Sequence, residues 1–171
     1  YFAQKSYFCS NKQNKLPKSY QIYLDAYQQS ILSRDTTYRI MKIAIPQINY
    51  HIGDISKNKD LIIAAIKKAK AMKAELVLFP EHAICGAYPQ DLFEKECFVN
   101  ECRVSIEKIA EQCHNIAALV GGPNLDLEDG ILMNAMFFMY DGEVRGGVNK
   151  TILSDYDVFD ESRYFIPGES N

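Results

Sequence analysis

The chain has 171 residues, of which 47% are hydrophobic, so it is long enough to fold as one domain around a sizeable core. Its formal net charge is −3 at pH 7. That balance gives no basic field to attract nucleic acid or an anionic membrane, and it leaves a small molecule or another protein as the expected partner.

The sequence shows no apolar run that could cross a bilayer and no signal-peptide pattern. The five cysteines form no CxxC pair, and their odd number argues against a disulfide framework, so we expect reduced thiols and a cytoplasmic location.

Residues 1–40 differ in composition from the rest of the chain. They contain six basic and two acidic residues, six of the eleven tyrosines and few aliphatic residues. This composition fits an upstream extension that is poorly ordered or not native, with Met41 as the natural start of the protein. It also fits an N-terminal arm that packs on the domain through its tyrosines. In either case the domain is expected to occupy residues 41–171.

The first elements after Met41 alternate between strand and helix patterns. A strand is predicted over residues 42–49 from its β-type composition. Apolar residues at helical spacing predict a helix over 57–73, with Asp54 and Ser56 as candidate N-caps. A consecutive apolar run then predicts a buried strand over 75–79.

A second helical region is predicted over residues 91–113. Asp91 is its candidate cap, and an apolar stripe at helical spacing includes Cys102 and Cys113. We therefore expect these two cysteines to be core residues, because a small apolar thiol on a helix stripe usually packs in the interior.

The rest of the regular structure is predicted to be a strand and a hairpin. The strand covers residues 115–122 and a polar loop covers 123–130. Residues 131–140 and 143–149 then flank Asp141-Gly142, a dipeptide that favours a two-residue hairpin turn. The order strand, helix, strand, helix, strand, hairpin predicts an α/β fold with helices on one face of a sheet.

Glu81 is the first candidate catalytic residue, because it follows a predicted buried strand after Pro80. Ligands of open α/β sheets gather at the carboxyl ends of strands, and a carboxylate that is buried there can serve as a general base. The alternative interpretation is an acid in the first turn of a helix, where the helix dipole favours it.

Lys150 follows the second arm of the predicted hairpin and is the second candidate. Taken alone, it fits a solvated strand end. Together with Glu81, a base and a fixed cation at neighbouring strand ends could serve one nucleophile and one developing oxyanion.

The sequence gives little indication of metal or phosphate chemistry. His51, His82 and His114 have no ligand spacing, so no metal site is expected. Neither a GxSxG nor a P-loop sequence occurs, and Gly121-Gly122 is interpreted as a turn rather than a phosphate cradle.

Several segments in chain order resemble successive motifs of the nitrilase superfamily. They are Met41-Lys-Ile-Ala-Ile-Pro-Gln-Ile-Asn49, Leu78-Phe-Pro-Glu81, Gly86 to Leu92, Met133-Asn-Ala135 with Asp141-Gly142, and Lys150 to Gly168. The run from Tyr156 to Gly168 most resembles the glutaminase domain of the glutamine-dependent NAD synthetases. The resemblance implies a nitrilase-like α-β-β-α sandwich, of which residues 41–171 would be a truncated, N-terminal portion.

The resemblance also implies roles for particular residues. A Glu-Lys-Cys triad would hydrolyse the amide of glutamine, with Glu81 as the base and Lys150 as the cation that holds the oxyanion. Tyr156, Phe159 and Glu161 fall in the glutamine-binding loop of such enzymes, and Glu161 would bind the substrate α-ammonium. The released ammonia would pass to a further domain that uses ATP and Mg²⁺ to amidate deamido-NAD, in a full-length protein expected to be a homo-oligomer. No cofactor is expected within the 171 residues.

Two departures limit this interpretation. The cysteine nucleophile of such enzymes lies beyond the lysine, and no cysteine follows Lys150, so the 171 residues alone are expected to be inactive. Ala87 stands where a substrate-contacting tyrosine is usual, and Tyr88 is displaced by one position. Cys85, four residues after Glu81, is the alternative nucleophile. The alternative functions are a stand-alone amidase or carbamoylase of the same superfamily, and a non-catalytic interaction module.

Overall fold

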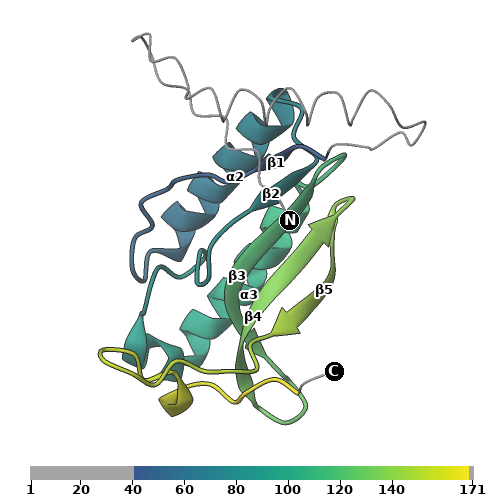
Figure 1. Ribbon diagram of the computed structural model, residues 1–171. Coiled ribbons are helices and arrows are strands. Elements are labelled where there is room, and N and C mark those ends of the chain that lie inside the picture. The colour runs from purple at the N-terminus through teal and green to yellow at the C-terminus, as the bar shows by residue number, and fades with distance from the viewer. Residues whose placement is uncertain (1–40, 170–171) are drawn as a thin grey trace, which may run out of the picture. The chain divides into compact units, whose positions relative to one another are not determined.

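A five-stranded mixed sheet lies at the centre of the computed structural model, which describes residues 41–169 (Figure 1). The first three strands are parallel, and the fourth is antiparallel to both of its neighbours. In order across the sheet they are β1 (Ile43–Ala44), β2 (Leu76–Leu78), β3 (Ala117–Leu125), β4 (Leu132–Tyr140) and β5 (Glu143–Asn149). The predicted α/β architecture is therefore confirmed for this part of the chain.

Helix α2 (Ile55–Ala71) begins two residues before the predicted range of 57–73, directly after Asp54, so the other candidate cap, Ser56, lies inside the helix. The side chain of Asp54 accepts a hydrogen bond of 3.1 Å from the backbone N–H of Lys57, which satisfies one of the free donors of the first turn. Ile62 and Ile66 then recur one turn apart and are fully buried. The Asp54 cap is confirmed.

The second predicted helical region is divided into two elements. A short 3₁₀ helix, η1 (Gln90–Glu94), is followed by Lys95 in an extended conformation and then by α3 (Glu96–Ala110). The predicted cap at Asp91 is wrong, because the extended backbone at Lys95 interrupts the helix and α3 begins without a side-chain cap. Asp91 instead accepts a hydrogen bond of 2.7 Å from the hydroxyl of Tyr164.

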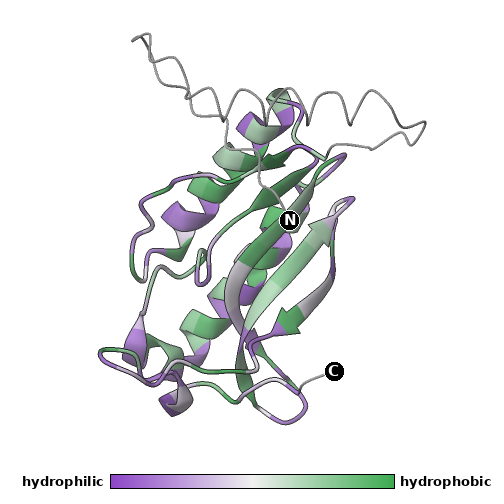
Figure 2. Cartoon of the chain, in the orientation of Figure 1, coloured by the Kyte–Doolittle hydropathy of each residue, from purple (hydrophilic) through white to green (hydrophobic). Residues whose placement is uncertain are grey.

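Both helices cover the same face of the sheet, as predicted (Figure 1). Strand residues alternate between faces, and the helix-facing set is buried against the apolar stripes of α2 and α3. Figure 2 shows the corresponding hydrophobic colouring along the central strands and on parts of both helices. The core residues of this layer are Ile62, Ile66, Val77, Cys102, Ile106, Ile109, Cys113, Ala118, Val120 and Met139. The prediction that Cys102 and Cys113 are core residues is confirmed.

The opposite face of the sheet is also apolar but is exposed in the described part of the chain. The register brings Leu78, Leu119 and Phe138 into one row across β2, β3 and β4. Leu78 and Phe138 are 36% and 40% exposed, and Ile43 on β1 is 51% exposed. We call this side the open face. Its residues are apolar like those of a protein core, but no other element of residues 41–169 covers them.

The strand ends differ from the sequence predictions for reasons that involve proline. The first strand has two residues rather than the eight predicted over 42–49, since Pro46 cannot donate to a ladder. β3 continues through Pro123, which the sequence places in a loop. The proline is tolerated because β2 ends at Leu78. At the level of Pro123 no residue of β2 is present to accept the hydrogen bond that a backbone N–H would donate.

The hairpin between β4 and β5 turns as predicted. Asp141 and Gly142 both have positive φ angles, 55° and 85°, as a type I′ turn requires.

The predicted extension over residues 1–40 lies outside the described residues. Among residues 41–169 no helix is long and apolar enough to cross a membrane. The four cysteines described here, Cys85, Cys97, Cys102 and Cys113, are free thiols.

Candidate active site

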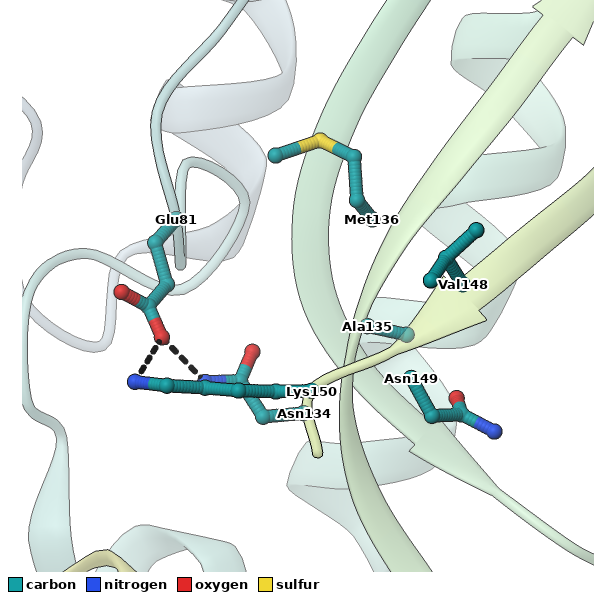
Figure 3. A pocket seen from close by; sticks show the side chains of 7 residues that line it. All are labelled: Glu81, Asn134, Ala135, Met136, Val148, Asn149 and Lys150. Atoms are coloured by element: carbon teal, nitrogen blue, oxygen red, sulfur yellow. Dashed lines mark hydrogen bonds and ion pairs between the residues drawn. The ribbon is translucent and has the colours of Figure 1, made fainter. Parts of the chain in front are cut away.

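Polar side chains meet at one edge of the sheet. Because β2, β3 and β5 run in the same direction, their carboxyl ends share this edge with the start of β4. Glu81 follows β2, Lys150 follows β5 and Asn134 lies near the start of β4. Figure 3 shows these three side chains converging on one pocket of about 270 Å³, whose other wall includes Met136 and Val148.

The structure brings the two candidate catalytic residues into contact. Lys150 Nζ lies 2.9 Å from Glu81 Oε1. The strand ends are not neighbours as predicted, since β3 and β4 separate β2 from β5. The long lysine side chain spans this gap.

A glycine allows the turn that carries Glu81 to lie close against β3. A Cβ atom at Gly121 would stand 2.6 Å from Pro80 O and 2.7 Å from Glu81 Cα. Both atoms belong to backbone, which cannot move aside as a flexible side chain can. Gly121 therefore lies inside a strand as a close-approach position, and its interpretation as part of a turn is wrong.

All three N–H groups of the Lys150 ammonium are engaged. Besides Glu81, Nζ donates to Glu161 Oε2 at 2.7 Å and to Ser154 Oγ at 3.1 Å. Burial lowers the pKa of Lys150, but its hydrogen bonds to Glu161 and Glu81 and the charges of these carboxylates outweigh burial and raise the pKa above its ordinary value. The ammonium is therefore a fixed charge at neutral pH.

Glu161 is buried, with a side chain only 3% exposed, and protein donors surround its carboxylate. Oε2 accepts from Lys150 and from the backbone N–H of Ser154 at 2.6 Å, and Oε1 accepts from Asn134 Nδ2 at 2.9 Å. Burial raises the pKa of Glu161, but the bonds from Lys150 and Ser154 outweigh it and hold the pKa below its ordinary value. Glu161 is thus ionised and paired, and a substrate ammonium would have to displace Lys150 to reach it.

Asn134 is a site residue that the sequence analysis missed, although it noted the Met-Asn-Ala motif. Its Nδ2 donates to Glu81 Oε1 at 2.5 Å and to Glu161 Oε1 at 2.9 Å, so one amide links both carboxylates. Asn134 interrupts an otherwise apolar strand and is only 2% exposed. A buried polar residue of this kind needs partners, and this is the signal that could have identified it.

Glu81 differs from its prediction in one respect. Its side chain is 48% exposed, so the expected burial of this carboxylate is wrong. Oε1 accepts from both Lys150 and Asn134, and Figure 3 shows the other oxygen turned away from these two donors. That oxygen accepts no hydrogen bond from Lys150 or Asn134 and belongs to a side chain that is about half exposed.

Tyr156 and Phe159 lie on the loop that begins at Lys150. Their rings contact each other at a centroid distance of 5.4 Å, and Phe159 contacts the displaced Tyr88 at 5.2 Å. The hydroxyl of Tyr88 accepts from the backbone N–H of Asp160, on the same loop. Neither Tyr156 nor Phe159 lines the pocket described above. The two aromatic residues form an exposed group beside the pocket rather than part of its wall.

Cys85 is unsuited to the role of alternative nucleophile. It is fully buried, and its Sγ lies 3.7 Å from the carbonyl oxygen of His82. Its interaction with Cys102 and burial raise its pKa well above the ordinary value, so the reactive thiolate is disfavoured.

Glu81, His82 and Glu161 have ligand atoms within 4.8 Å of one another, close enough to hold a metal ion. Lys150 Nζ, however, already bonds to both carboxylates. In this arrangement the ammonium supplies the positive charge that a metal ion would otherwise bring.

Comparisons with known proteins identify the family of the chain. A model of the carbon-nitrogen hydrolase family matches residues 42–170. A glutamine-dependent NAD(+) synthetase from Xylella fastidiosa is 37% identical over 126 residues, which is 73% of this chain and 23% of that protein. The crystal structure of such a synthetase from Cytophaga hutchinsonii superposes with a TM-score of 0.73 at 27% identity, covering 77% of this chain and 22% of the other.

An amidase from Nesterenkonia sp. is similar as well. It has a TM-score of 0.63 at 26% identity, and the match covers 76% of this chain and 49% of the amidase. The chain spans about a quarter of the length of the synthetases that it matches. The match over residues 42–170 shows that the chain belongs to the carbon-nitrogen hydrolase family, and the similar solved structures show that it has the N-terminal portion of a nitrilase-like fold.

Proposed function

We propose that the protein containing this chain hydrolyses the side-chain amide of glutamine and supplies the ammonia for ATP-dependent amidation of deamido-NAD to NAD. The observation that carries the proposal is Lys150, an ammonium held at the sheet edge between Glu81 and Glu161 at 2.9 and 2.7 Å. A fixed cation beside an accessible carboxylate is what amide hydrolysis by a thiol requires. The names of the similar synthetases supply the substrate and the product.

In the first step, Oε2 of Glu81 takes the proton of a cysteine thiol that lies outside the described residues. The thiolate attacks the amide carbon, and the carbonyl oxygen becomes an oxyanion. When Glu81 is protonated it loses its charge, so its bond to Lys150 weakens and one N–H of the ammonium becomes available to the oxyanion. The same proton is then given to the leaving amine as ammonia departs.

In the second step, Glu81 removes a proton from water as the water attacks the thioester, and it returns that proton to the cysteine sulfur when the C–S bond breaks and glutamate leaves. Glu161 stays ionised throughout and holds Lys150 through Oε2. We therefore assign Glu161 to the orientation of Lys150 instead of to the substrate α-ammonium. Tyr156 and Phe159 remain the proposed glutamine-binding residues of the adjoining loop.

The ATP- and Mg²⁺-dependent step is assigned to a domain outside this chain. The glycine pair weighed as a phosphate cradle, Gly121-Gly122, is packed within β3. Assembly as a homo-oligomer and a cytoplasmic location belong to the same proposal for the complete protein.

The test is a Glu81→Gln variant of the complete protein, assayed for glutamate release and for NAD formation. We expect glutamine hydrolysis to fall by at least ~10²-fold, in the range for a general base. NAD formation from added ammonia should remain, because the variant removes only the ammonia source. Glu107→Gln, on the exposed surface of α3, is the matched control and should change neither rate.

Two results would contradict the proposal. An unchanged hydrolysis rate in Glu81→Gln removes this residue from the mechanism. Amide hydrolysis without any glutamine-dependent NAD formation favours the stand-alone amidase, which the similarity to the Nesterenkonia enzyme makes the second candidate.

A further inference from the structure

His82 is a buried titratable residue beside the candidate site that the proposed mechanism does not use. It follows Glu81 directly, has a positive φ of 55° and is 5% exposed. Its ring lies 5.6 Å from the ring of Phe93 and 5.7 Å from that of Phe165, nearly parallel to the latter. These aromatic contacts fix the plane of the imidazole, so each ring nitrogen has a defined neighbour.

The two ring nitrogens face different groups. Nδ1 lies 3.8 Å from Cys85 Sγ. Nε2 lies 3.3 Å from Asn134 Nδ2 and 3.8 Å from Glu161 Oε1. His82 therefore stands between a buried thiol and the carboxylate that holds Lys150.

The hydrogen-bond inventory of Asn134 decides the tautomer. Its amide nitrogen has two hydrogens, and the carboxylates of Glu81 and Glu161, at 2.5 and 2.9 Å, take both. No hydrogen is left to donate to Nε2 of His82. The ring proton is therefore assigned to Nε2, whose N–H faces the Glu161 carboxylate at 3.8 Å in an electrostatic contact longer than a hydrogen bond, while the unprotonated Nδ1 lies beside Cys85 Sγ.

We propose that His82 is a positioning residue for amide hydrolysis: a neutral imidazole, protonated on Nε2, whose N–H attracts Oε1 of Glu161 electrostatically across 3.8 Å, so that Oε2 stays on Lys150. The inference rests on the proposed function, because its consequence is the placement of the oxyanion-binding ammonium. Asn134 and His82 together restrain one oxygen of Glu161, and Lys150 and Ser154 restrain the other. Without His82, Glu161 can rotate and Lys150 loses one fixed partner.

The neutral state of the ring follows from the charges around it. Burial lowers the pKa of His82, Glu81 and Glu161 raise it, Lys150 lowers it, and the net direction is down. On its other side the ring faces the Cys85 thiol, which is uncharged. Protonation of Nδ1 would place a second cation near Lys150.

Two substitutions of His82 in the complete protein test the proposal by activity. His82→Leu keeps an apolar side chain in the aromatic contact but removes the donor, and His82→Gln retains an amide N–H. We expect His82→Leu to lower kcat by ~10-fold with KM little changed, which is the scale of effect when a residue that orients a functional group is removed. His82→Gln should recover most of this loss. Phe98→Leu, which removes a ring that packs on Phe93 at a centroid distance of 6.2 Å, is the control and should reduce stability with little effect on kcat.

A second readout does not depend on activity. In the 171-residue chain labelled with ¹⁵N-histidine, long-range ¹H–¹⁵N spectra report the tautomer, and His82→Gln identifies the signal among three histidines. We expect the Nε2–H form at neutral pH. An Nδ1–H form, or a kcat for His82→Leu equal to the wild-type value, overturns the inference.

The two proposals can fail separately. If Glu81→Gln abolishes glutamine hydrolysis and His82→Leu does not change it, only the positioning role is wrong. If the wild-type protein hydrolyses no glutamine, the proposed function is wrong, and the positioning role in that reaction is overturned with it whatever the tautomer.

Discussion

The charge state of the Glu161–Lys150 pair predicts how stability depends on pH. The pKa of Glu161 is lowered in the folded chain, so its stabilising contribution is present above the ordinary value of about 4.3 and is lost as the pH falls through the folded value. The pKa of Lys150 is raised, so its contribution is present below about 10.4 and is lost as the pH rises through the folded value. The pair is therefore complete between these limits.

Glu161→Gln removes the charge from this pair while nearly conserving its shape. We expect the free energy of unfolding at pH 7 to fall by about 2 kcal/mol, the scale of a hydrogen bond to a charged group, since Lys150 keeps Glu81 as a partner. The variant should also lose less stability than the wild type between pH 5 and 3, because the titrating group is gone. Urea unfolding of the chain at several pH values measures both effects.

Glu107→Gln serves as the control for this prediction. Its partner Arg103 is 2.9 Å away, but both side chains are about half exposed, and such surface pairs contribute little. An equal loss of unfolding free energy in the two variants would show that the buried Glu161 contributes no more to stability than an exposed glutamate.

Among the elements, β3 contains a close-approach glycine that the sequence alone does not reveal. Gly121 faces the backbone of the turn that carries Glu81, and a Cβ there would lie within 3 Å of three backbone atoms. We expect Gly121→Ala to cost about 1–3 kcal/mol of unfolding free energy, as overpacking does, and to reduce activity by displacing Glu81. Urea unfolding and the glutamine assay of the complete protein measure the two effects.

Gly146 in β5 is the matched control for Gly121. It is also a strand glycine, but a Cβ at this position meets no atom within 4 Å. Gly146→Ala should therefore leave both stability and activity close to the wild-type values. A cost confined to Gly146→Ala, or shared equally by both variants, would contradict the close-approach role of Gly121.

The sequence predicts the order of the elements because periodicity is a local property. Ile62 and Ile66 repeat at helical spacing, and Asp141-Gly142 requires a turn whatever the remaining chain does. The end of β3 could not be predicted in the same way. Pro123 is excluded from most strands, and only the end of β2 at Leu78 makes it acceptable here.

The candidate site was predictable only in part, for a related reason. Glu81 and Lys150 each follow a strand, which a single sequence reveals. The roles of Asn134 and His82 depend on contacts between residues 27 or more positions apart, and spacing along the chain carries no sign of them. The exposure of Glu81 depends in the same way on what covers the sheet edge.

For the whole molecule, the main consequence of the fold is the open face of the sheet. Ile43, Leu78, Phe138 and Tyr140 are between 36% and 51% exposed on this side. Exposed apolar surface that is contiguous across strands favours association between molecules, and the outer edge of β1, which no strand of residues 41–169 pairs, adds backbone donors and acceptors. The 171-residue chain is therefore expected to self-associate through this face.

The double substitution Ile43→Thr and Phe138→Thr tests this prediction, because threonine suits a strand but removes most of the apolar area. We expect the variant to remain monomeric at concentrations where the wild-type chain associates, as measured by sedimentation velocity. The control is Ile152→Thr with Val158→Thr, on the loop after β5, where both side chains are exposed but lie off the sheet. Equal suppression by the control pair would assign the association to exposed apolar residues in general, whereas an effect of the first pair alone assigns it to the open face.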